Sequence, residues 1–85
     1  MNVMDDRDLA RRIVADPAVM TGKPVIRGTR LTVDLILNLL AHGQSEQDIL
    51  AEYDGLTAED IRACLLFATH SIESAAFMPL MLEPA

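Results

Sequence analysis

The sequence predicts a mainly α fold of three to four helices in a helix-turn-helix bundle, with a small N-terminal β-hairpin. At 85 residues the chain is long enough for one small domain. Its sequence divides near Val33 into an extended, turn-rich part and a part with a nearly continuous helical pattern. We therefore expect an N-terminal arm (1–15), a helix-turn-helix-like domain (16–70) with the hairpin at 24–33, and the end of the third helix with an apolar tail (71–85).

The hairpin is predicted from two short runs that flank Gly28-Thr29. A Gly-X pair suits a type II′ turn, and the resulting register has three cross-strand pairs: Arg27 with Arg30, Ile26 with Leu31, and Val25 with Thr32. Ile26 and Leu31 then face the core, and the two arginines share the other face. Before the Asp16-Pro17 turn the pattern fits either a helix over 5–13 or a third strand over 12–15.

The first helix of the domain is expected from Thr32, its N-cap, to His42, with Gly43 at its C-terminal end. Its apolar residues lie almost all round, which predicts burial on nearly every side. His42 is interpreted as favouring the C-terminus of this helix.

Ser45 is predicted to cap a short second helix that ends at Asp54-Gly55, and Thr57 opens a third helix with a capping box to Asp60. Ala51 would lie where these two helices cross. The third helix is expected to run to about Phe77, with an inward stripe next to Cys64 formed by Ile61, Leu65, Ala68 and Ile72. Segment 45–69 thus has a helix-turn-helix layout.

Charge is distributed unevenly along the chain. Residues 1–33 hold six of the seven cations and four acids, whereas residues 34–85 hold Arg62 and nine acids. The formal net charge of −6 argues against a general attraction to nucleic acid. The third helix would turn outward Ala58, Glu59, Arg62 and Ala63, close to Asp60, and its acids make it a poor reader of bases.

Lys23, Arg27 and Arg30 form the first candidate site, with Arg62 as a further anion-binding candidate. Two guanidinium groups across a hairpin need an anion or a carboxylate beside them. Three interpretations stay open: ion pairs with acids of the same chain or a second copy, such as Asp34 or Glu52; phosphate of DNA or RNA; and an acidic partner protein.

The C-terminal tail is the second candidate site. Its apolar cluster around Pro79 consists of Phe77, Met78, Leu80, Met81 and Leu82. This cluster either folds back over the core or inserts into a groove of another protein.

Other chemistry finds little support in the sequence. His42 and His70 lack the spacing of metal ligands, and no nucleophile and base are paired, so we expect neither an enzyme nor a cofactor. The single Cys64 and the lack of a signal peptide or of an apolar run long enough to span a membrane predict a reduced, soluble, cytoplasmic protein.

Residues 13–70 closely resemble family 433 of the bacterial domains of unknown function. The shared pattern is Asp16-Pro17, Gly22 to Pro24, Ile26 to Arg30, Gly43, Ser45, Tyr53, and Leu56 to Ile61. The resemblance implies a homeodomain-like helical domain with a small β element, often dimeric. It also implies a VapB-type antitoxin, because such genes commonly neighbour those of PIN-like ribonucleases, whose active site is a cluster of carboxylates.

The resulting hypothesis is a non-enzymatic, homodimeric antitoxin that dimerises through the hairpin region and the apolar first helix. Its tail would mask the ribonuclease, and its arginines would contact operator DNA or enter the toxin's active site. The alternatives are a stand-alone transcription regulator and an interaction module that binds only protein.

Overall fold

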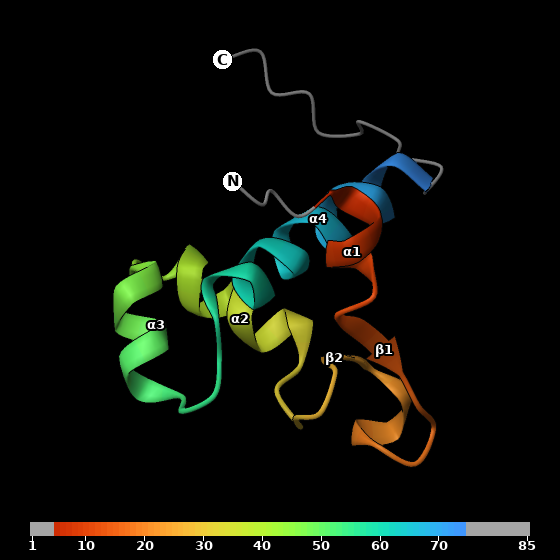
Figure 1. The fold of residues 1–85 in the computed structure, drawn as a ribbon, viewed down its shortest axis with the longest axis horizontal. Helices are drawn as coiled ribbons and strands as arrows, with labels where there is room; N and C mark the ends of the chain where they lie inside the picture. Colours follow the sequence, from red (N-terminus) through yellow and green to blue (C-terminus); the bar gives the residue numbers. More distant parts are fainter. Residues whose placement is uncertain (1–4, 75–85) are drawn as a thin grey trace.

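The computed structural model describes residues 5–74, which form four helices, one 3-10 turn and a two-stranded antiparallel sheet. In chain order these are α1 (Asp6–Ala10), β1 (Ile13–Ala15), η1 (Met20–Gly22), β2 (Pro24–Ile26), α2 (Val33–Ala41), α3 (Glu46–Glu52) and α4 (Ala58–Ser74). Figure 1 shows α3 at one end of the molecule and the sheet at the other, with α4 running between α1 and α2. The mainly α fold with a small β element is therefore confirmed.

The helices begin where side chains cap them. Thr32 accepts a hydrogen bond from the backbone N–H of Leu35 (3.1 Å), and Ser45 and Asp48 form a reciprocal capping box at α3. At α4 the Asp60 N–H donates to the Thr57 hydroxyl (3.2 Å), and the Thr57 N–H donates to the Asp60 carboxylate (3.0 Å). These three helix starts were predicted from the sequence and are confirmed.

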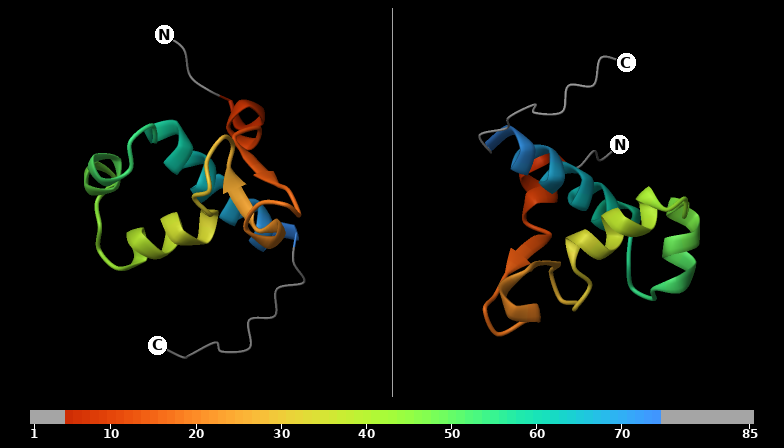
Figure 2. Two further views of the ribbon diagram at one scale, coloured as in Figure 1. Left: turned by 90° about the horizontal axis from the view of Figure 1, so that it is seen from below. Right: turned by 180° about the vertical axis from the view of Figure 1, so that it is seen from behind.

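The N-terminal segment belongs to the fold. The sequence pattern left a helix and a strand as alternatives before Asp16, and the structure contains both, α1 followed by β1. Helix α1 packs on α4, and β1 pairs antiparallel with β2 in the register Ile13 with Ile26, Val14 with Val25, and Ala15 with Pro24. Over residues 5–15, the expected arm thus supplies a helix and a strand, which the two views of Figure 2 place against the rest of the chain.

The hairpin at 24–33 is smaller than predicted. Its register is confirmed at the Val25 to Thr32 bridge and at the Ile26 N–H, which donates to the Leu31 carbonyl (2.9 Å). The second strand does not continue, because Thr32 already serves as the N-cap of α2. The turn spans Ile26 to Thr29, with Gly28 third at φ +80°, which is a type II turn and not the type II′ turn expected at Gly28-Thr29.

The core lies where β2 and the three longer helices meet. Its buried members are Ile26, Val33, Ile36, Ile49, Leu56, Ile61 and Cys64. Two expected features are not found within the single chain. In α2 only Val33 and Ile36 are buried while its leucines are half-buried, and Ala51 of α3 is exposed.

The inward face of α4 also differs from the predicted stripe. Ile61 and Cys64 are buried as expected, but Leu65 is 47% and Ile72 60% exposed. Asp60 and Ala63 are buried instead, because α1 and β1 cover that side of the helix. The face of α4 that meets the core is therefore rotated away from the apolar stripe that its sequence suggests.

Candidate partner and nucleic-acid interfaces

The turn between β2 and α2 presents the candidate arginines. The Thr29 hydroxyl donates to the Ile26 carbonyl (2.8 Å) and accepts from the Leu31 N–H (3.0 Å), so it bridges the two sides of the turn. Gly28 takes a positive φ in which a side chain would be strained. Ile26 is buried behind this turn, and Arg27 and Arg30 are exposed, as the sequence predicted.

Arg27 donates two hydrogen bonds to backbone carbonyls of the segment before β1. Its Nε donates to the carbonyl of Arg11 at 2.8 Å, and its own N–H donates to the carbonyl of Arg12 at 2.7 Å. Each guanidinium has further N–H donors, so this contact orients Arg27 and leaves donors for an anion. The side chain of Arg11 lies 3.8 Å from Asp8 in an exposed ion pair.

Arg30 lines a groove of about 530 Å³ formed by β1, β2, the segment between them and the turn that follows β2. The other lining residues are Val14, Asp16, Val19, Val25, Gly28 and Thr29. Within residues 5–74 the ion pairs are Arg11 with Asp8, Arg12 with Asp60 and Lys23 with Asp34. Arg27, Arg30 and Arg62 therefore pair with no carboxylate in this part of the chain, and the expected pairing of the two hairpin arginines with Asp34 or Glu52 does not occur there.

Lys23 is the candidate cation that does have an acidic partner. Its Nζ lies 3.6 Å from Asp34 Oδ2, with both side chains more than half exposed. The pKa of Asp34 is lowered, first by hydrogen bonding to the Thr32 hydroxyl and then by the charge of Lys23. An exposed pair of this kind contributes little to stability, so Lys23 can exchange Asp34 for another anion.

An ion pair that was not predicted joins the N-terminal segment to α4. Arg12 Nη1 lies 2.9 Å from Asp60 Oδ1, and the side chains are 30% and 9% exposed. The same carboxylate caps α4 through its other oxygen. Asp60 and Ala63, placed near the outward face of α4 by the sequence, point inward, and Glu59 is half-buried. Arg62 is exposed as predicted. Among the α4 residues expected to face bases, it is the one most accessible to a partner.

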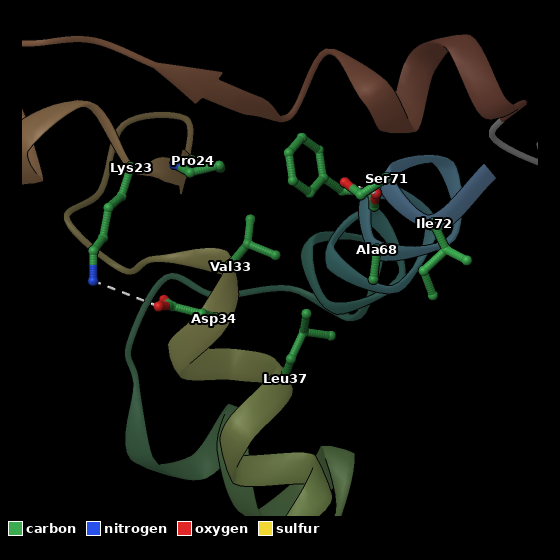
Figure 3. Close-up of a pocket in the computed structure, with 9 residues that line it drawn as sticks. Lys23, Pro24, Val33, Asp34, Leu37, Ala68, Ser71 and Ile72 are labelled. Carbon is green, nitrogen blue, oxygen red and sulfur yellow. Dashed lines mark hydrogen bonds and ion pairs between the residues drawn. The ribbon is translucent and has the colours of Figure 1, made fainter. Parts of the chain in front are cut away.

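An apolar groove of about 400 Å³ separates the start of α2 from the second half of α4. Figure 3 shows Val33 and Leu37 of α2 facing Ala68 and Ile72 of α4, with the Lys23 to Asp34 pair at one end. Phe67, which is 36% exposed, also lines it. This groove was not predicted, because the apolar stripe of α4 placed Ala68 and Ile72 in the core.

The remaining candidates are quickly placed. Burial raises the pKa of the Cys64 thiol to about 12, with a smaller contribution from Asp60, so this thiol is unreactive at neutral pH. His42 sits at the C-terminal end of α2 with Nδ1 2.8 Å from the Asn38 carbonyl. Residues 5–74 contain no cluster of three or more His, Cys, Asp or Glu side chains suited to a metal ion, and no described helix could span a membrane. The five tail residues predicted to bind a partner lie outside the described residues.

Comparisons with known proteins assign the family. A family model described as "Protein of unknown function (DUF433)" matches residues 13–68. The chain belongs to this family. The matched region starts at β1 and ends in α4. It includes the arginine turn and the α2 wall of the apolar groove, but of the α4 wall only Phe67 and Ala68, because Ile72, α1 and the tail lie outside it.

Two relatives agree with this assignment. The uncharacterized protein y4eO of Sinorhizobium fredii is 38% identical over 66 residues, which are 76% of this chain and 30% of that protein. The crystal structure of a DUF433 member from Anabaena variabilis has a TM-score of 0.71 and 33% identity, covering 79% of this chain and 66% of that one. The chain therefore spans less than a third of y4eO, and the family leaves its activity open.

Proposed function

We propose that this protein is the antitoxin-like component of a type II toxin-antitoxin system and has no enzymatic activity of its own. It binds and neutralises a PIN-like ribonuclease with its C-terminal segment and represses its operon by contacting operator DNA. The ribonuclease partner is what the family resemblance implies. The observation that carries the role in binding is the exposed turn on which Arg27 and Arg30 have no carboxylate partner within residues 5–74.

Arginine is suited to both proposed partners. Its planar fork binds phosphate and carboxylate alike, so the turn can contact DNA or enter the carboxylate cluster that the resemblance implies for the toxin. A homodimer presents the turn twice. The half-buried leucines of α2 supply apolar surface for this dimer.

Co-expression with the neighbouring open reading frame tests the antitoxin role. The two proteins should copurify, and the neighbour should arrest growth when it is expressed alone. A neighbour that is neither toxic nor bound would exclude the antitoxin role. The tail contribution is tested in the full chain by Leu80→Asp, which should weaken copurification, with Leu65→Asp as the control, because Leu65 is exposed on α4 and lies outside the candidate tail.

A gel-shift salt titration on the upstream DNA tests the role in repression. Replacing one phosphate-contacting arginine should reduce the slope of log K against log salt by about 0.9. Arg30→Ala should show this reduction, and Arg7→Ala, which removes an exposed cation from α1, should not. No shift at low salt would exclude DNA binding.

A stand-alone transcription regulator is the second candidate function. The helix-turn-helix layout of α3 and α4 and the exposed Arg62 favour it. Glu59 in the first turn of α4 is half-buried and carries a negative charge beside Arg62, which disfavours base reading by that helix. Binding to upstream DNA by a protein whose neighbour is neither toxic nor bound would select this function.

A further inference from the structure

We propose that the apolar C-terminal segment, residues 77–83, docks in the groove between α2 and α4 of its own chain when no partner is bound. The apolar walls of this groove are formed by Val33, Leu37, Phe67, Ala68 and Ile72, and the Lys23 to Asp34 pair stands at one end. This inference goes beyond the proposed function and does not depend on the identity of the partner.

The surface of the groove favours an apolar ligand. Ile72 is 60% and Phe67 36% exposed, although both are large apolar side chains on the longest helix of the fold. Between them, α2 and α4 leave about 400 Å³ of space lined almost wholly by apolar groups. Burial of such side chains is the main source of binding free energy, so a segment rich in Leu, Met and Phe matches this surface.

The tail is long enough to reach the groove. The described part of α4 ends at Ser74, two residues after Ile72 in the groove wall, and Phe77 follows three residues later. The lining stretches of α2 and α4 span between one and two helical turns, roughly 6 and 8 Å. An extended run of six residues covers up to ~20 Å. A segment tethered this closely has an effective concentration on the order of millimolar, which favours it over the same segment of a second copy.

Charged residues set the direction in which the docked segment runs along the groove. The apolar run 77–82 is followed by Glu83. Lys23 at the end of the groove holds Asp34 only in an exposed pair at 3.6 Å. Glu83 can take the place of Asp34 at Lys23 and is repelled by Asp34 itself, so the Asp34→Asn variant should strengthen docking and the Glu83→Gln variant should weaken it.

Docking has a consequence for partner binding. The tail residues that the antitoxin role assigns to the ribonuclease would be covered in the free protein, and the partner would have to displace them. The intramolecular contact thus lowers the apparent affinity for the partner and shields an apolar segment from aggregation.

Paramagnetic relaxation in the 85-residue chain tests the proposal. A nitroxide attached through an Ala85→Cys substitution should broaden the methyl signals of Val33 and Leu37, and the buried Cys64 thiol should remain unlabelled because its pKa is raised. In the same labelled chain, Ile72→Asp should lower the equilibrium constant for docking about tenfold and weaken the broadening, since one large apolar contact is lost. Leu65→Asp is the matched control, because Leu65 is exposed on the same helix but outside the groove; it should leave the broadening unchanged.

Two results would overturn the proposal. The first is the absence of broadening at Val33 and Leu37, which leaves the groove without the tail. The second comes from mixing spin-labelled chain at natural isotope abundance with isotope-labelled chain that lacks the nitroxide. Broadening in this mixture at the strength seen within one chain would show that the tail of a second copy occupies the groove. If docking fails while copurification with the neighbour succeeds, the antitoxin role stands without this regulation.

Discussion

The ion pair between Arg12 and Asp60 should be the polar contact that most strongly fastens the N-terminal segment to α4. The pair is 2.9 Å long, and the Asp60 side chain is only 9% exposed. A hydrogen bond to a charged group contributes ~1.5–3 kcal/mol, and the 30% exposure of Arg12 places this pair toward the lower end of that range. We therefore expect a coupling free energy of about 1–2 kcal/mol between the two side chains.

A double-mutant cycle measures this coupling. Arg12→Met keeps the aliphatic stem, and Asp60→Asn keeps an oxygen that can cap α4, so each change removes mainly the ion pair. The free energy of unfolding is taken from urea titrations followed by circular dichroism at one protomer concentration, because dimerisation would make stability depend on it. Each single variant should also lower Tm by ~4–8 °C per kcal/mol lost.

The exposed pair of Arg11 and Asp8 provides the matched control. It joins the same residue types, but its side chains are 70% and 50% exposed and 3.8 Å apart. Its cycle should give a coupling of ~0–0.5 kcal/mol. Equal coupling in the two cycles would refute the argument that burial strengthens the contact of Arg12 with Asp60.

Three further predictions concern single positions. The pKa of Asp48 is lowered because the Ser45 N–H and hydroxyl donate hydrogen bonds to its carboxylate. The stabilising effect of the charged Asp48 is therefore present above about pH 4 and is lost as the pH falls through the lowered pKa. Asp48→Asn should flatten the acid limb of a plot of unfolding free energy against pH. Cys64 should react with a thiol reagent at neutral pH only as fast as the protein unfolds, and rapid modification of the native protein would contradict its burial. Gly28→Ala should destabilise the fold by ~1–2 kcal/mol in a urea titration although nothing lies within 4 Å of the added methyl group, because φ is +80°.

Local rules predicted the features of this fold that depend on neighbouring residues. The caps at Thr32, Ser45 and Thr57 require partners only three residues away, and each is present. The cross-strand pair of Val25 with Thr32 was also predicted, because it is set by a short turn. The second strand was overestimated because one residue, Thr32, serves both the bridge and the helix cap.

The features missed depend on which distant segments cover a helix. Asp60 was expected near the outward face of α4, yet Arg12, 48 residues earlier, pairs with it and buries it. Periodicity alone placed Leu65 and Ile72 in the core, since it cannot tell that α1 and β1 pack on the other side of α4. The groove was missed for the same reason, because the apolar residues that were predicted to lie in the interior line an open surface.

The proposed DNA binding should depend on the proposed dimer, because one protomer supplies few unpaired cations. Among the nominated cations, Lys23 is paired within residues 5–74, and Arg27, Arg30 and Arg62 have no carboxylate partner there. Three phosphate contacts give a salt slope of about −2.7, whereas a protein that loses about 10³–10⁵ in affinity between low and moderate salt makes 6–10 contacts. Two protomers double the three arginines and reach the lower end of this range. Operator binding through these residues should therefore depend steeply on protein concentration and fail in a monomeric variant, while a carboxylate cluster on a toxin can be contacted by one protomer.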